Sequence, residues 1–147
     1  MKTKLIYFLL IAFTISVYSQ KKSLNIEGTW KLVQTQTLTG TKSVIDFPGK
    51  TVVDQTKIWS GNNFMFVARV KTDTIVENMY GVGTYKLQGN RYEEYLKIIS
   101  YKPWEGKTIL MTIEMKNDTL IQTYPVDNNG QIDKNWAAIE KYVKIKK

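Results

Sequence analysis

Apolar and polar residues alternate along much of the chain after residue 27, and no window there keeps the helical period of about 3.6 residues. Alternation with a period of two is typical of β-strands that bury one face. Clusters of Gly, Asn, Asp and Pro, which favour turns, separate the alternating stretches. The pattern therefore predicts an all-β domain with eight strands, over residues 29–38, 56–60, 64–70, 83–87, 91–100, 107–115, 119–124 and 136–145.

Short connections join these strands into hairpins. Gly61-Asn62-Asn63, Gln88-Gly89-Asn90 and Lys116-Asn117-Asp118 consist of residues that tolerate the positive φ of a tight turn, and Pro48-Gly49 closes an earlier loop. Consecutive hairpins bring neighbouring strands together at a small loop-closure cost, and closing the sheet removes its edges. We therefore predict an antiparallel up-and-down β-barrel, with a short helical turn at Gln131–Lys134.

Residues 1–19 have the pattern of a secretory signal peptide. Lys2 and Lys4 precede an apolar run from Leu5 to Val17, which is too short to span a bilayer. Small residues at positions 17 and 19 predict cleavage after Ser19, and a retained anchor is the alternative. The sequence thus predicts an exported protein, periplasmic or extracellular, with a lead-in at residues 20–26, a barrel domain at residues 27–147 and no transmembrane segment in its mature form.

Composition narrows the possible chemistry. The chain has no cysteine and no histidine, which excludes a thiol nucleophile, a disulfide framework, a Cys or His zinc site and a Ser-His-Asp triad. The formal charge of +8 falls to +6 without Lys2 and Lys4, and the basic residues do not alternate with aromatic residues on one strand face. We therefore predict no nucleic-acid partner, no metal site and no cofactor.

One strand shows clearly which side chains face inward. Ile109, Met111, Ile113 and Met115 share one face of residues 107–115, while the polar residues lie on the other. Methionine is flexible, so Met111 and Met115 either line an adaptable cavity or fill a core. Aromatic residues near the hairpins fit a core and a pocket wall equally well. The candidate ligand-binding residues are Trp59, Phe64, Phe66, Tyr85, Tyr92, Glu94, Met111, Ile113 and Tyr124.

Two adjacent carboxylates, Glu93 and Glu94, point to opposite faces of their strand, so they cannot act as a paired acid and base. Glu94 shares its face with Tyr92, Leu96 and Ile98. If that face is the interior, the carboxylate needs a Lys or Arg across the barrel or a neighbouring tyrosine hydroxyl. Three interpretations stay open: a structural polar network, a group that orients a ligand, and a catalytic acid.

The sequence also resembles a known family. Gly28-Thr29-Trp30 resembles the Gly-x-Trp motif that opens the lipocalins. The motifs Gly83-Thr84-Tyr85, Gly89-Asn90, Tyr92-x-Glu94 and Glu140-x-Tyr142-x-Lys144 resemble those of an exported bacterial lipocalin-like family, over nearly the whole mature chain. The resemblance implies an eight-stranded barrel with an internal cavity and a role in binding or transport.

The resemblance also gives expectations for Trp30 and Lys144, and the turn at Gly61 gives one for Trp59. The family commonly has Trp and Arg where this chain has Tyr142 and Lys144, and lipocalins stack that arginine over the opening tryptophan. Lys144 can offer Trp30 a cation–π attraction but no planar guanidinium. Trp30 is expected to close one end of the barrel, whereas Trp59, beside the turn at Gly61, is expected near a rim.

Three functions follow from these observations. The first is binding or carrying a small, mainly apolar ligand in a barrel cavity. The second is a structural or protein-interaction role in the cell envelope with a fully packed barrel, and a continuous cavity of about 300 Å³ or more would count against it. The third is a hydrolytic or isomerase-type enzyme using Glu94. We predict that the protein is not an enzyme, because no nucleophile and base can be paired by their spacing.

Overall fold

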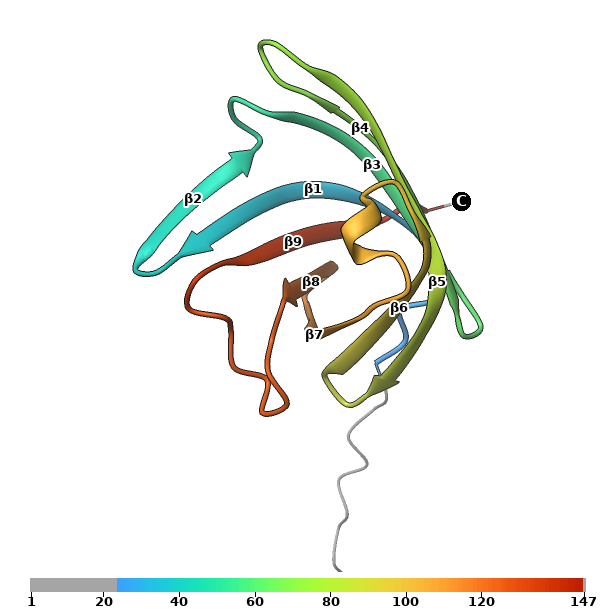
Figure 1. The fold of residues 1–147 in the computed structure, drawn as a ribbon. Coiled ribbons are helices and arrows are strands. Elements are labelled where there is room, and N and C mark those ends of the chain that lie inside the picture. Colours follow the sequence, from blue (N-terminus) through green and yellow to red (C-terminus); the bar gives the residue numbers. More distant parts are fainter. Residues whose placement is uncertain (1–23, 147) are drawn as a thin grey trace, which may run out of the picture.

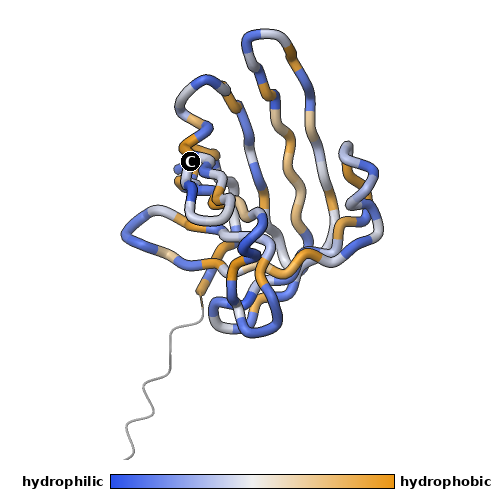
Figure 2. Tube along the Cα trace, turned by 60° about the vertical axis from the view of Figure 1, so that its left-hand side comes forward, coloured by the Kyte–Doolittle hydropathy of each residue, from blue (hydrophilic) through white to orange (hydrophobic). Residues whose placement is uncertain are grey.

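The computed structural model describes residues 24–146, so the predicted signal peptide, residues 1–19, lies outside the described residues. The described chain forms nine β-strands and one short 3-10 helix (Figure 1). Orange and blue segments alternate along the strands in Figure 2, as expected for a sheet with one buried face. The elements are β1 Gly28–Thr39, β2 Lys42–Phe47, β3 Val52–Ser60, β4 Asn63–Lys71, β5 Val76–Gln88, β6 Arg91–Ile99, η1 Lys102–Trp104, β7 Thr108–Lys116, β8 Thr119–Tyr124 and β9 Ala137–Lys144.

The strands form a closed antiparallel barrel of eight strands with one additional strand. The order is β1-β3-β4-β5-β6-β7-β8-β9, and β9 closes the barrel by pairing with β1. The additional strand is β2, which pairs with the second half of β1, while the first residues of β1 pair with β3. The predicted fold class is confirmed, and the eight predicted strands correspond to the eight strands of the barrel.

The predicted helical turn at Gln131–Lys134 is wrong. Ile132 instead forms an isolated β-bridge with Val126. The Asp127 carboxylate accepts hydrogen bonds from the backbone N–H groups of Asn129 and Gln131, which holds this segment in a turn before a helix can begin. The short helix is η1, which contains Pro103 near its start and lies over one end of the barrel (Figure 1).

Two inward-facing glycines make room for aromatic rings inside the barrel. A Cβ at Gly81 would lie 2.3 Å from the ring of Phe66, and a Cβ at Gly83 would lie 1.8 Å from the backbone oxygen of Tyr95 and 3.0 Å from the ring of Phe64. These glycines therefore let Phe64 and Phe66 occupy space that side chains of β5 would otherwise fill.

Trp30 closes one end of the barrel. Its side chain is buried, and its Nε1–H donates a 2.8 Å hydrogen bond to the backbone oxygen of Ile26 in the lead-in. The Lys144 ammonium lies 5.5 Å from the centroid of the Trp30 ring, which is within the range of a cation–π contact. The turns after β3, β5 and β7 lie at this closed end, because alternate connections of an antiparallel barrel share one end.

The expectation that Trp59 lies near a rim is wrong. Its side chain is 1% exposed and packs edge-to-face against Trp30, Tyr92 and Tyr142, with centroid separations of 6.3, 6.5 and 6.0 Å. Trp59 is near a turn, but it faces inward at the end that Ile26 and Trp30 cover. Proximity to a turn therefore does not expose it.

Candidate ligand-binding site

A buried ion pair crosses the middle of the barrel. Lys57 of β3 contacts Glu94 of β6, and their side chains are only 4% and 3% exposed. The Lys57 ammonium also donates a 3.3 Å hydrogen bond to Oε1 of Gln122, and it lies 5.0 Å from the ring centroid of Trp59 and 5.2 Å from that of Phe64. With the Tyr92 ring centroid at 6.0 Å, this cation contacts one carboxylate, one amide oxygen and three aromatic rings.

A hydrogen-bond chain leads to the same carboxylate. Trp59 Nε1–H donates to the Tyr92 hydroxyl at 2.6 Å, and that hydroxyl donates to Oε1 of Glu94 at 2.6 Å. Burial, and then the negative charge of Glu94, raise the pKa of Tyr92 well above its usual value, so its hydroxyl stays a donor. Glu94 therefore has both kinds of partner that its inward position required, a lysine across the barrel and a neighbouring tyrosine.

A second carboxylate, Glu140 of β9, faces the same space. Tyr124 donates to its Oε1 at 2.8 Å and Tyr142 donates to its Oε2, while the Tyr142 hydroxyl accepts a 2.8 Å hydrogen bond from Nε2 of Gln55. Burial, followed by the charge of Glu140, raises the pKa of Tyr124 and Tyr142 well above the usual value. Within residues 24–146, Glu140 forms no salt bridge.

These groups surround a cavity of about 50 Å³ in the half of the barrel away from Trp30. That volume accommodates a few water molecules or one small head group, and it is well below the ~300 Å³ of an ordinary ligand pocket. The polar lining residues are Gln55, Lys57, Glu94, Gln122, Tyr124 and Glu140. The apolar lining residues are Phe66, Leu96, Ile99, Trp104, Ile109 and Met111.

Four aromatic residues connect this cavity to the surface, and we call them the mouth cluster: Tyr101, Trp104, Tyr124 and Trp136. Each ring packs edge-to-face on the next, with centroid separations of 5.7, 6.3 and 6.2 Å. Trp104 and Tyr124 line the cavity, whereas Tyr101 and Trp136 are 52% and 39% exposed. The cluster is a continuous aromatic surface that leads from solvent to the two carboxylates.

The predicted ligand-binding residues all face inward, but the structure brings only some of them to the cavity. Phe66, Glu94, Met111 and Tyr124 line it. The remaining predicted residues belong to the core or pack against it away from the cavity: Trp59, Phe64, Tyr85, Tyr92 and Ile113.

Sequence reasoning missed several residues of the site. Gln55 and Lys57 lie on the same buried face of β3 as Trp59, and the residues between them are exposed or half-buried. Gln122 shares the buried face of β8 with Leu120. Glu140 shares its face with Tyr142 in the same way. This shared parity is a signal that could have identified these four residues. Trp104 lies on η1, where no strand pattern indicates its direction.

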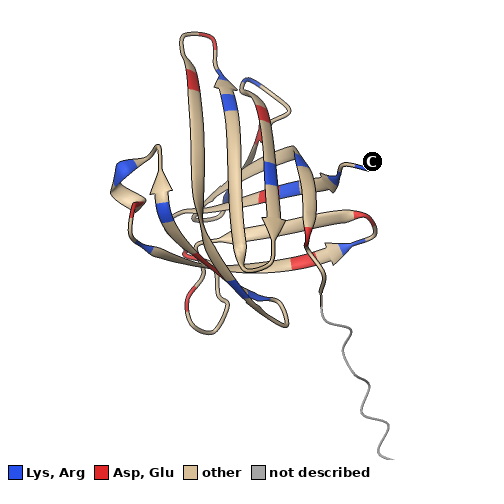
Figure 3. Cartoon of the chain, turned by 90° about the vertical axis from the view of Figure 1, so that its right-hand side faces the viewer, with Lys and Arg blue, Asp and Glu red and all other residues tan. Residues whose placement is uncertain are grey.

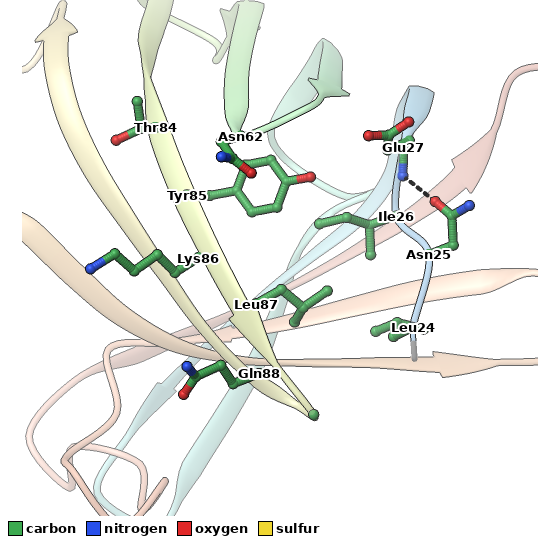
Figure 4. Close-up of a pocket in the computed structure, with 11 residues that line it drawn as sticks. Leu24, Asn25, Ile26, Glu27, Asn62, Thr84, Tyr85, Lys86, Leu87 and Gln88 are labelled. Atoms are coloured by element: carbon green, nitrogen blue, oxygen red, sulfur yellow. Dashed lines mark hydrogen bonds between the residues drawn. The ribbon is translucent and has the colours of Figure 1, made fainter. Parts of the chain in front are cut away.

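A larger groove lies at the closed end, between the lead-in and the end of β5, with a volume of about 820 Å³ (Figure 4). Tyr85 and Leu87 point toward the lead-in, while Lys86 and Gln88 point away from it. Burial, together with the charge of Glu27, raises the pKa of Tyr85. None of the polar side chains that line this open groove is buried, so it lacks the fixed polar groups that orient a ligand.

No protein-family model and no curated protein matches the chain. Among the described residues, no helix is long and apolar enough to cross a membrane. The same residues contain no group of three or more acidic side chains placed to hold a metal ion.

Proposed function

We propose that the chain is an exported, lipocalin-like binding protein that holds a small molecule at the polar cavity and the mouth cluster. One observation supports this most directly: all four polar or charged residues that are buried in the described chain line this one cavity. They are Gln55, Lys57, Glu94 and Gln122.

The free-energy cost of burying these polar groups favours a binding role over a purely structural one. A buried ion pair contributes little to stability, and apolar residues of similar volume are often as good or better. A barrel selected only for packing would place apolar side chains at these positions. Retaining a satisfied polar network beside a cavity is a feature of functional sites.

The proposed ligand has a polar part and an apolar part. The cavity of about 50 Å³ accommodates a polar head group, and the mouth cluster offers apolar surface for the rest of the molecule. The mainly apolar ligand suggested by the sequence is thus placed with its apolar body against Trp104 and Trp136. The ligand enters at the end opposite Trp30, and the site performs binding with no catalytic step.

Native mass spectrometry of the protein purified from its source tests this proposal. We expect a non-covalent adduct that is released on denaturation. Trp104→Ala, which removes one wall of the cavity, should abolish the adduct. Glu93→Gln, on the outer face of β6, is the matched control and should retain it. Source protein that never carries a small molecule would overturn the proposal.

A second candidate function rests on the outer face of β4, β5 and β6. Met65, Val82 and Ile98 lie directly opposite one another across these strands, and Val67 opposes Tyr80. These side chains are between 37% and 54% exposed, and a contiguous apolar patch of this kind often marks a protein interface. The observation supports docking of an envelope protein on this face.

A photo-crosslinker at position 82 tests the second candidate, with position 86 on the same strand as its control. A single defined crosslinked protein obtained in cells from position 82, and none from position 86, is the expected result. Equal crosslinking from both positions would reject docking at this face.

A further inference from the structure

The charged groups that line the cavity are unbalanced. Glu94 and Glu140 each bring a carboxylate, whereas Lys57 is the single cation among the described lining residues. The Lys57 ammonium pairs with Glu94, and within residues 24–146 Glu140 accepts hydrogen bonds only from the hydroxyls of Tyr124 and Tyr142. Glu140 is half-buried, and its partial shielding from water strengthens the attraction for a second cation beside it.

The hydrogen-bonding capacity of Glu140 fits such a cation. A carboxylate offers about four lone-pair positions, and the hydroxyls of Tyr124 and Tyr142 occupy one on each oxygen. An ammonium group brings three donors and no acceptor. Its donors match the unfilled positions, whereas an anionic ligand in the cavity would face two carboxylates.

The protein already binds one ammonium in this manner. The Lys57 ammonium is held by Glu94 and lies near the faces of Trp59 and Phe64. Glu140 offers the same combination of a carboxylate with aromatic neighbours, because Tyr124 hydrogen-bonds to it and packs edge-to-face on Trp104. A ligand ammonium there would repeat the Lys57 arrangement on the other side of the cavity.

We infer that the ligand is an organic cation, a primary amine whose ammonium group enters the cavity beside Glu140 and whose apolar body lies on the mouth cluster. This inference rests on the proposed function, because it names the ligand class of that same site. The cavity of about 50 Å³ admits an ammonium and its first carbon, so the remaining carbons extend toward Trp104 and Trp136.

Calorimetric titration of ligand-free protein with three six-carbon probes tests the inference. Hexylamine is cationic at pH 7, hexan-1-ol is neutral and hexanoate is anionic. We expect hexylamine to bind at least about tenfold more tightly than hexanol, which is the lower end for a hydrogen bond to a charged group, and hexanoate not to bind. Hexanol or hexanoate binding as tightly as hexylamine, or no binding of hexylamine, overturns the inference.

Two variants locate the contact. Glu140→Gln removes the charge with little change in shape and should weaken hexylamine about tenfold while leaving hexanol unchanged. Glu93→Gln, outside the barrel, should change neither affinity. If Glu140→Gln does not fold, Trp104→Leu on η1 replaces it and should weaken hexylamine more than hexanol, through lost cation–π attraction. If the variant weakened hexylamine and hexanol equally, a cationic head group would be contradicted.

The outcomes also separate this inference from the proposed function. A copurifying neutral or anionic molecule whose adduct is lost in Trp104→Ala would retain the binding role and reject the cation. The absence of any copurifying molecule, with no binding of any probe, would reject both.

Discussion

At the scale of single residues, the stability of the barrel depends on the buried ion pair between Lys57 and Glu94. Both charges are almost completely shielded from water, so neither can lose its partner without leaving an uncompensated charge. We expect Lys57→Met to destabilise the barrel by about 3–5 kcal/mol and Lys57→Met combined with Glu94→Leu to recover much of that loss. Urea unfolding monitored by tryptophan fluorescence measures both. A single variant as stable as the unmodified protein would show that the pair is not buried as described.

Three tyrosines predict how stability changes with alkaline pH. Burial raises the pKa of Tyr92, Tyr124 and Tyr142 well above 10.0, and Glu94 or Glu140 adds to the shift. Because the folded pKa lies above the unfolded one, the stabilisation is complete below pH 10 and is lost as pH rises further. We expect the urea midpoint to fall above pH 10, and the tyrosinate absorbance of these three residues to appear only on unfolding. Full tyrosine titration in a folded barrel would contradict this.

The two core tryptophans differ in what else they support. Truncating a buried aromatic residue costs about 3–5 kcal/mol, and this applies to both Trp30 and Trp59. Each indole donates one hydrogen bond, Trp30 to Ile26 and Trp59 to Tyr92, but Trp59 packs against three aromatic rings and Trp30 against one. We therefore expect Trp59→Ala to cost at least as much as Trp30→Ala in denaturant unfolding. A clearly smaller loss of stability for Trp59→Ala than for Trp30→Ala would contradict the buried position of Trp59.

Parity explains how much of the site the sequence could predict. Glu94 could be assigned to the interior because Tyr92 and Leu96 share its face, and the structure gives it the expected partners. Placing Ile98 on that face was wrong, because a register shift between β5 and β6 turns it outward and Ile99 is buried instead.

Lys57 and Glu140 obey the same rule. The predicted strand of Lys57, residues 56–60, is too short to establish its parity, and the predicted strand of Glu140, residues 136–145, carries apolar residues on both faces. The size of the cavity could not be predicted, because it depends on how side chains from six strands and η1 fill the interior.

At the scale of elements, hairpin turns predicted the barrel better than strand patterns predicted its strand lengths. The turns at Gly61 and Gly89 mark real hairpins, each with a glycine at positive φ. β2 was missed because its first residues are exposed on both faces and show no alternation. The first half of β5 was missed because Gly81 and Gly83 interrupt the apolar pattern, although their small size is what the packing requires.

Gly83 provides a test of that packing. It lies at a register shift between β5 and β6, and an added Cβ would meet the Tyr95 backbone oxygen, which cannot move without displacing β6. We expect Gly83→Ala to cost about 1–3 kcal/mol by overpacking. Thr84→Ala, on the exposed face beside it, should stay within about 0.5 kcal/mol of the unmodified protein. Comparable urea midpoints for Gly83→Ala and the unmodified protein would contradict the close approach of these strands.

At the scale of the whole molecule, charge supports small-molecule binding better than binding to a polyanion. Figure 3 shows basic and acidic residues interspersed along the strands and turns. Among the described residues that line the cavity, the buried Glu94 and the half-buried Glu140 outnumber the buried Lys57. The protein is thus basic overall and acidic at its cavity, which separates the chemistry of its surface from that of the proposed site.

Residues 1–19 predict that the chain is exported. The Lys2 and Lys4 charges, the apolar run and the small residues at positions 17 and 19 predict cleavage after Ser19. We expect intact-mass and N-terminal sequencing of protein from the periplasm or medium to begin at Gln20. Val17→Arg, which places a bulky charge at the cleavage site, should leave an uncleaved precursor in the membrane fraction. Lys22→Arg, beyond that site, is the control and should be processed normally. Protein that begins at Met1 in the soluble fraction would reject the signal peptide, and with it the exported form of the proposed function, while leaving the cavity and its carboxylates as a site to be tested inside the cell.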